Sequence, residues 1–105
     1  DMTEREKFSG RLFALGLKPH LKGYAYLLAG AERYAASGTL PTEAELAAAC
    51  GVAQDHLVRA LDMCAVLAEY RTGRHFENGR TLLRAVAAAE KGKNGRKQKG
   101  ARRRL

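Results

Sequence analysis

The stretch ACGVAQDHLVRALDMC, residues 49–64, has the pattern of a tight turn followed by the second helix of a helix-turn-helix. Gly51 suits the turn because glycine adopts positive φ angles without steric cost. Ala47, four residues earlier, is small enough for the point where two helices cross. Apolar residues flank these two points and would hold the helices together: Leu46, Cys50, Val52, Leu57 and Ala60. The stretch therefore predicts a short helix, a turn and a longer second helix.

Apolar residues recur every three or four positions along most of the chain, which predicts an all-α fold. About five helices are expected, over residues 3–15, 19–36, 42–50, 53–70 and 79–91. Capping boxes at Thr3 with Glu6 and at Thr42 with Glu45 support the first and third helices, and Asn78 is a candidate cap for the last. No segment alternates apolar and polar residues, so no strand is expected. A chain of 105 residues fits one small domain.

The net charge of +8 belongs to the end of the chain. Residues 1–90 contain all eleven acidic residues and eleven of the nineteen lysines and arginines, so their charges cancel. The other eight cations are Lys91, Lys93, Arg96, Lys97, Lys99, Arg102, Arg103 and Arg104. Residues 91–105 also contain three glycines and few apolar side chains. We therefore expect a helical domain over residues 1–90, followed by a flexible basic tail over residues 91–105.

Several classes of function find no support in the sequence. Cys50 and Cys64 form no metal-binding motif with the three histidines, so we expect buried thiols and neither a metal nor another cofactor. The sequence has no phosphate-binding glycine loop or nucleophile elbow, so we do not expect an enzyme. No apolar run is long enough to span a membrane, and the first residues are charged. These two features predict a cytoplasmic protein without membrane contact.

A second stretch, LGLKPHLKGYAYLLAGAE at residues 15–32, carries a resemblance to a known family. It resembles the opening signature of the DNA-binding effector domain of the stage-zero sporulation response regulators of endospore-forming bacteria. HLKGY at residues 20–24 and YL at residues 26–27 follow the family's order, while Pro19 stands one position late. The resemblance resumes at Leu46 and Ala47 and runs through VRAL at residues 58–61.

The resemblance covers about residues 12–70 and implies an all-α domain that places a helix-turn-helix in the major groove of double-stranded DNA. It implies transcription regulation in sporulation and a bacterial protein that associates with the nucleoid when bound. Family members normally carry a receiver domain ahead of this one, for which a chain of 105 residues has no room.

The chain departs from the family at the positions that read bases. Family members tend to have arginine, glutamate, arginine, arginine and histidine where this chain has His56, Val58, Arg59, Asp62 and Met63. Only Arg59 keeps the family's residue. In this chain the candidate base contacts are therefore Gln54, His56 and Arg59, because these side chains can donate hydrogen bonds to base edges.

The candidate phosphate contacts are Lys22 and the eight cations of the tail. Three acids on the same predicted helix would oppose phosphate groups: Asp55, Asp62 and Glu69.

Two alternatives to a sequence-specific regulator stay open. Val58, Met63 and Val66 are apolar residues on the predicted outer side, where they would suit a partner protein or a second copy of the chain. In this interpretation the scaffold serves protein interaction and the recognition helix has degenerated. The other alternative is a nonspecific nucleic-acid binder that relies on the basic tail alone.

Overall fold

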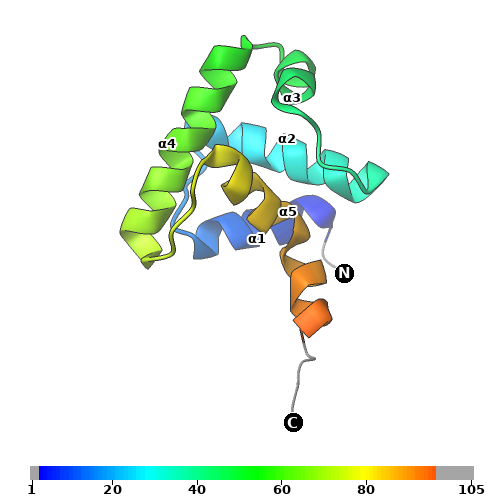
Figure 1. Ribbon diagram of the computed structural model, residues 1–105, viewed down its shortest axis with the longest axis vertical. Coiled ribbons are helices and arrows are strands. Elements are labelled where there is room, and N and C mark those ends of the chain that lie inside the picture. The colour runs from blue at the N-terminus through cyan, green and yellow to red at the C-terminus, as the bar shows by residue number, and fades with distance from the viewer. Residues whose placement is uncertain (1–2, 97–105) are drawn as a thin grey trace.

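The computed structural model describes the backbone of residues 3–96 and the side chains of residues 3–88. Within that part the chain forms helices and no strand, which confirms the all-α prediction (Figure 1). The five helices are α1 (Glu4–Ala14), α2 (Lys22–Ser37), α3 (Glu43–Cys50), α4 (Gln54–Thr72) and α5 (Gly79–Arg96).

The predicted helix starts are largely confirmed by their hydrogen bonds. In α1 the hydroxyl of Thr3 accepts the N–H of Glu6, whose carboxylate accepts the N–H of Thr3 in return. Thr42 and Glu45 make the same pair of bonds at the start of α3. At α5 the side-chain oxygen of Asn78 accepts the N–H of Thr81 at 2.9 Å. Each cap satisfies backbone donors that have no partner inside the helix.

Two predicted helix boundaries were wrong. α2 begins at Lys22 and not at Pro19, because residues 18–21 form a turn in which the N–H of Leu21 donates to the carbonyl of Lys18 at 3.1 Å. Pro19 occupies the second position of that turn, where its fixed φ is as suitable as at a helix start. α5 continues to Arg96 instead of ending at residue 91, so its backbone includes the first part of the predicted tail. The side chains of the eight tail cations lie outside the described residues.

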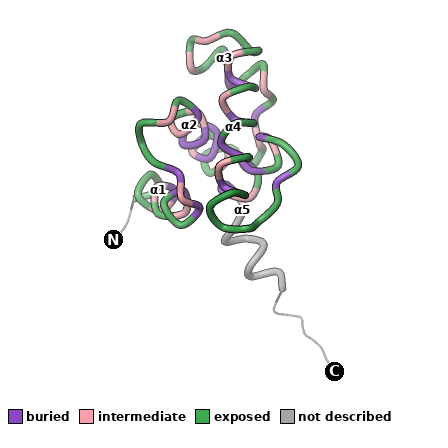
Figure 2. The backbone as a smooth tube through the Cα atoms, turned by 90° about the vertical axis from the view of Figure 1, so that its left-hand side faces the viewer, coloured by how far each residue is buried: buried purple, intermediate pink, exposed green. Residues whose placement is uncertain are grey.

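The hydrophobic core lies where α2, α4 and α5 meet, and α1 covers one side of it. In Figure 2 the buried residues of these helices face inward, while their outer sides are exposed. Leu27 of α2, Leu57 and Leu61 of α4 and Leu82 of α5 are almost completely buried. The loop residue Phe76 closes the core between α4 and α5. The guanidinium carbon of Arg74 lies over its ring, 4.9 Å from the ring centroid.

Two glycines allow helices to approach more closely than any other residue would. A Cβ atom on Gly79 would overlap the Cβ and carbonyl carbon of Leu61. A Cβ atom on Gly23 would lie 2.5 Å from the sulfur of Cys64 and 2.7 Å from the carbonyl oxygen of Ala60. α4 is therefore packed directly against the starts of both α5 and α2.

Several arginines of the helical domain hold its segments together. The guanidinium of Arg11 donates to the carbonyl of Val86 on α5. Arg71 donates to the carbonyl of Gly16 at 2.9 Å, and Arg80 to that of Pro41 at 2.7 Å. Because these donors already have carbonyl partners, they are poor candidates for binding an external anion.

Candidate nucleic-acid interface

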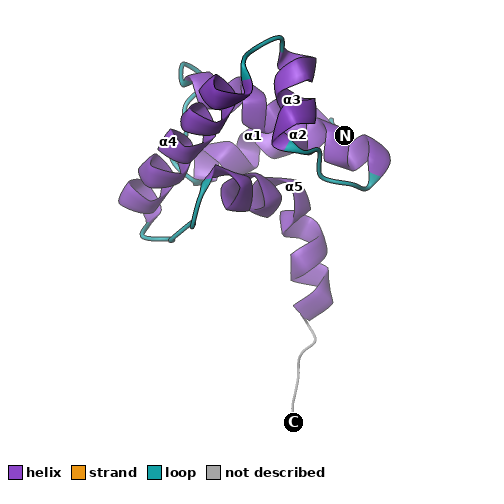
Figure 3. Ribbon diagram, turned by 45° about the horizontal axis from the view of Figure 1, so that its top comes forward, coloured by secondary structure: helices purple, strands orange, loops and turns teal. Residues whose placement is uncertain are grey.

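The connection between α3 and α4 has the geometry that residues 49–64 predicted. Gly51 adopts φ 71° and ψ 32°, the left-handed conformation that favours glycine. The N–H of Val52 donates to the carbonyl of Ala47 at 3.0 Å, and that of Gly51 to Ala48 at 3.2 Å, which closes the end of α3. α4 begins three residues later and runs along one edge of the molecule, with α3 beside its first turn (Figure 3). This arrangement is compatible with a helix-turn-helix.

The three candidate base contacts do not share one side of α4. His56 and Arg59 are three positions apart and lie on the same side, whereas Gln54 lies five positions before Arg59 and two before His56. Gln54 is the first residue of α4 and is exposed. Arg59 is exposed and has no hydrogen-bond or ion-pair partner within residues 3–88.

His56 has a partner inside the protein. Its Nε2 atom shares a hydrogen bond of 3.0 Å with the hydroxyl of Tyr26 on α2. The two rings meet edge to face at 79°, with their centroids 5.9 Å apart. His56 is thus half-buried in the contact between α2 and α4, which leaves Arg59 as the unpaired donor on that side of the helix. The pairing joins residues 30 positions apart, so no local sequence pattern could reveal it.

Two of the three acids on α4 have partners that the sequence did not indicate. The carboxylate of Asp62 accepts the N–H of Gly79, the first residue of α5, at 2.7 Å. Glu69 lies 2.9 Å from Nδ1 of His75. Asp55 stands in the first turn of α4, where a negative charge favours the helix. These contacts give Asp62 and Glu69 structural roles that the sequence interpretation had not anticipated.

We expect Asp62→Ala to lower the free energy of unfolding by about 1–2 kcal/mol, because it leaves a partly buried N–H of α5 without its charged acceptor. Asp62→Asn keeps an acceptor of the same shape and should lose less than half as much. Urea unfolding of the three proteins at one pH measures the difference. Equal stability of Asp62→Ala and the unchanged protein would show that the bond to Gly79 contributes nothing.

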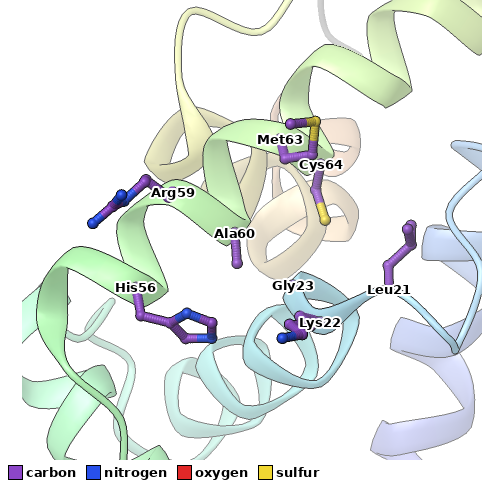
Figure 4. Close-up of a pocket in the computed structure, with 8 residues that line it drawn as sticks. All are labelled: Leu21, Lys22, Gly23, His56, Arg59, Ala60, Met63 and Cys64. Carbon is purple, nitrogen blue, oxygen red and sulfur yellow. The ribbon is translucent and has the colours of Figure 1, made fainter.

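A cleft of about 460 Å³ opens between the start of α2 and the middle of α4 (Figure 4). Its lining has an apolar floor and basic residues at the edge, with no acidic residue: Leu21, Lys22, Gly23, His56, Arg59, Ala60, Met63 and Cys64. In Figure 4 His56 points from α4 toward α2, while Arg59 points outward from α4. Sequence reasoning missed this cleft, although Gly23, Ala60 and Cys64 are the small residues that allow the close helix contact beneath it.

Both cysteines are unpaired thiols, and Cys64 forms part of the cleft floor. Cys64 is 1% exposed, and burial raises its pKa to about 11. Burial also raises the pKa of Cys50, while the charge of Arg33 partly offsets that effect. Both thiols are therefore protonated at neutral pH. Cys64 is buried, as predicted for a cysteine that packs as a small apolar residue, whereas Cys50 is only half-buried.

The exposed side of α4 also carries an apolar surface formed by Met63, Val66 and Tyr70, which are 58%, 62% and 86% exposed. Their spacing of three and four residues places them on one side of the helix, in line with Arg59. Val58, the third member of the predicted partner surface, is half-buried and lies on a different side. Tyr70 was missed by the sequence analysis, although its position seven residues after Met63 is the signal that would have included it.

No protein-family model, curated protein or solved structure matches this chain. None of the described helices is both long enough and apolar enough to cross a lipid bilayer. Within the described part of the chain, no three histidine, cysteine, aspartate or glutamate side chains come together as metal ligands would.

Proposed function

We propose that this protein is a DNA-binding transcription regulator, not an enzyme, and that it inserts α4 into the major groove of double-stranded DNA. The observation that carries the proposal is the α3–turn–α4 unit, which leaves Arg59 exposed and unpaired on the outer side of α4. An arginine in this position can donate two hydrogen bonds to one guanine, which is worth about 1–3 kcal/mol of discrimination. The resemblance to the sporulation effector domain supports the same role.

The helix starts near Arg59 supply further donors for phosphate groups. Leu21 precedes α2 and Ala53 precedes α4, and neither provides a side-chain cap. The first N–H groups of both helices therefore have no acceptor within their own helix, and DNA phosphates often occupy such positions. Lys22 is exposed at the start of α2, and Gln54 at the start of α4. Lys22 extends the donor surface around Arg59, and Gln54 adds a donor at the first turn of α4.

The basic tail would add affinity that does not depend on sequence. Its eight cations account for the whole net charge of the chain. Lysines and arginines that neutralise phosphates release condensed counterions, which raises affinity at low salt for any duplex. In this proposal the tail holds the protein on DNA, and the folded domain selects the sequence.

A second candidate function is binding of a partner protein through α4. The exposure of Met63, Val66 and Tyr70 on one helix side favours it, because an apolar surface of this kind is typical of protein interfaces. The two functions use the same side of α4 and are distinguished by the experiment below.

The test is to select preferred sequences from a random duplex library with the full chain and then measure affinities of two variants. Arg59→Ala should bind the selected duplex about tenfold or more weakly and lose most of its preference over a random duplex, since one bidentate base contact is removed. Arg84→Ala removes an exposed, unpaired arginine from α5 and serves as the matched control. If the library yields no preferred sequence, or if both variants bind alike, the proposal is wrong.

A further inference from the structure

The cleft between α2 and α4 combines an apolar floor with a basic edge. Ala60, Met63 and Cys64 line it from α4, and Leu21 lines it from the turn before α2. Lys22 and Arg59 are exposed at its edge, neither has an anionic partner in the described part of the chain, and no carboxylate lines the cleft. These features point to an occupant with an apolar body and a negative charge.

We propose that this cleft binds a small amphipathic anion, an apolar molecule that carries one carboxylate, sulfonate or phosphate group. Its apolar body would lie over Ala60 and Met63, and its anionic group would contact Lys22. Arg59 points outward in the structure, but its exposed and unpaired side chain can turn toward the same anion. The volume of about 460 Å³ lies within the range of clefts that hold small molecules.

The walls of the cleft are held in place by contacts within the protein. The hydrogen bond between His56 and Tyr26 joins α4 to α2 at one end. At the floor, the contact of Gly23 with Ala60 and Cys64 leaves no space for either helix to move closer. Because both contacts lie within the protein, a ligand would meet a surface that the fold itself forms, which lowers the entropic cost of binding.

The start of α2 adds to the attraction for an anion. Leu21, Lys22 and Gly23 are the cap position and the first two residues of the helix, and all three line the cleft. No side chain caps this end, and its first turn contains no acidic residue. The positive end of the helix dipole therefore acts in the same direction as the two cations.

A free phosphate ion would contact only the basic edge and leave the apolar floor exposed to water. An uncharged apolar molecule would contact only the floor. Because the proposed ligand needs both the floor and the edge, its binding can be distinguished from DNA binding, which needs Arg59 but not the apolar floor. The ligand site holds whether or not the chain binds DNA; if it does, ligand and DNA would compete for Arg59.

Two fluorescent probes that differ only in charge test the proposal on the full chain. 8-Anilinonaphthalene-1-sulfonate has an apolar body with one sulfonate, and N-phenyl-1-naphthylamine is the same body without it. We expect the anionic probe to bind at one site, and its affinity to fall about three- to fivefold in Lys22→Gln and in Arg59→Gln and about tenfold in the double variant at low salt. The neutral probe should change less than twofold in all three variants.

Arg84→Gln is the matched control, because Arg84 is exposed, unpaired and not part of the cleft lining. Circular dichroism establishes that each variant is folded, and backbone amide NMR shifts locate the probe. Shifts at Lys22, His56 and Met63 with the anionic probe support the cleft. Inorganic phosphate should bind at least tenfold more weakly than the anionic probe. Equal binding of phosphate, an unchanged anionic-probe affinity in the double variant, or shifts elsewhere would each overturn the proposal.

Discussion

Replacing Gly79 with alanine should lower the free energy of unfolding by about 3 kcal/mol, the upper end of what overpacking a protein interior costs. The added methyl group would overlap the Cβ and carbonyl carbon of Leu61, and the backbone nitrogen of Asp62 would lie 2.8 Å from it. These atoms belong to a helix and cannot rotate away as the end of a side chain would. Relief therefore requires α5 to move away from α4, which opens the core at Leu61 and Leu82.

A second glycine serves as the control that separates the steric overlap at Gly79 from the general effect of replacing glycine with alanine on stability. Gly10 lies inside α1, and a Cβ atom there would have no neighbour within 4 Å. Gly10→Ala should therefore raise the free energy of unfolding by about 0.5–1 kcal/mol, as alanine does in an open helix position. In chemical unfolding, the denaturant midpoints of the two variants should shift in opposite directions from that of the unchanged protein. A Gly79→Ala variant as stable as the unchanged protein would contradict the close packing of α4 on α5.

Raising the salt concentration from 50 to 200 mM should weaken duplex binding by the full chain about 1000-fold. If about six cations contact phosphates, namely Lys22 and five of the eight in the tail, the logarithm of affinity falls against the logarithm of salt with a slope near −5. Replacing all eight tail cations with glutamine should reduce the slope to about −1, since Lys22 would be the phosphate contact left. Affinity measurements by fluorescence anisotropy at four salt concentrations give these slopes.

The control for the tail keeps its charge and changes only the type of basic side chain. Replacing the four tail lysines, Lys91, Lys93, Lys97 and Lys99, with arginine should leave the slope unchanged, because counterion release depends on charge. A glutamine-substituted tail with the original slope would mean that the tail does not contact DNA.

Local features of the fold could be predicted from the sequence, because the information lies within a few residues. The capping boxes of Thr3 and Thr42 and the turn at Gly51 each depend on residues no more than four positions apart, and the structure confirms them. Pro19 was misplaced because its ring suits both a turn and a helix start. The extension of α5 to Arg96 was not predicted, because the composition of that segment indicates neither burial in a core nor a definite end of the helix.

The candidate site was harder to predict because its key contacts join distant positions. Asp62, which the sequence predicts to oppose phosphate groups, also accepts a hydrogen bond from Gly79, 17 residues later. His56, which is predicted as a base contact, also shares a hydrogen bond with Tyr26 on another helix. Both contacts depend on how α4 packs against α2 and α5, which helical periodicity alone does not determine. Arg59 is the predicted contact whose exposure and lack of a partner in residues 3–88 agree with its proposed role.

The central claim is that the folded domain, and not the basic tail, selects a DNA sequence through α4. The most direct measurement uses the full chain with its eight tail cations replaced by glutamine and compares its affinity for the selected duplex with that for a random duplex. We predict that this chain binds both duplexes more weakly but still prefers the selected one at least tenfold, and that Arg59→Ala removes that preference. Equal affinity for the two duplexes before Arg59 is changed would contradict the account.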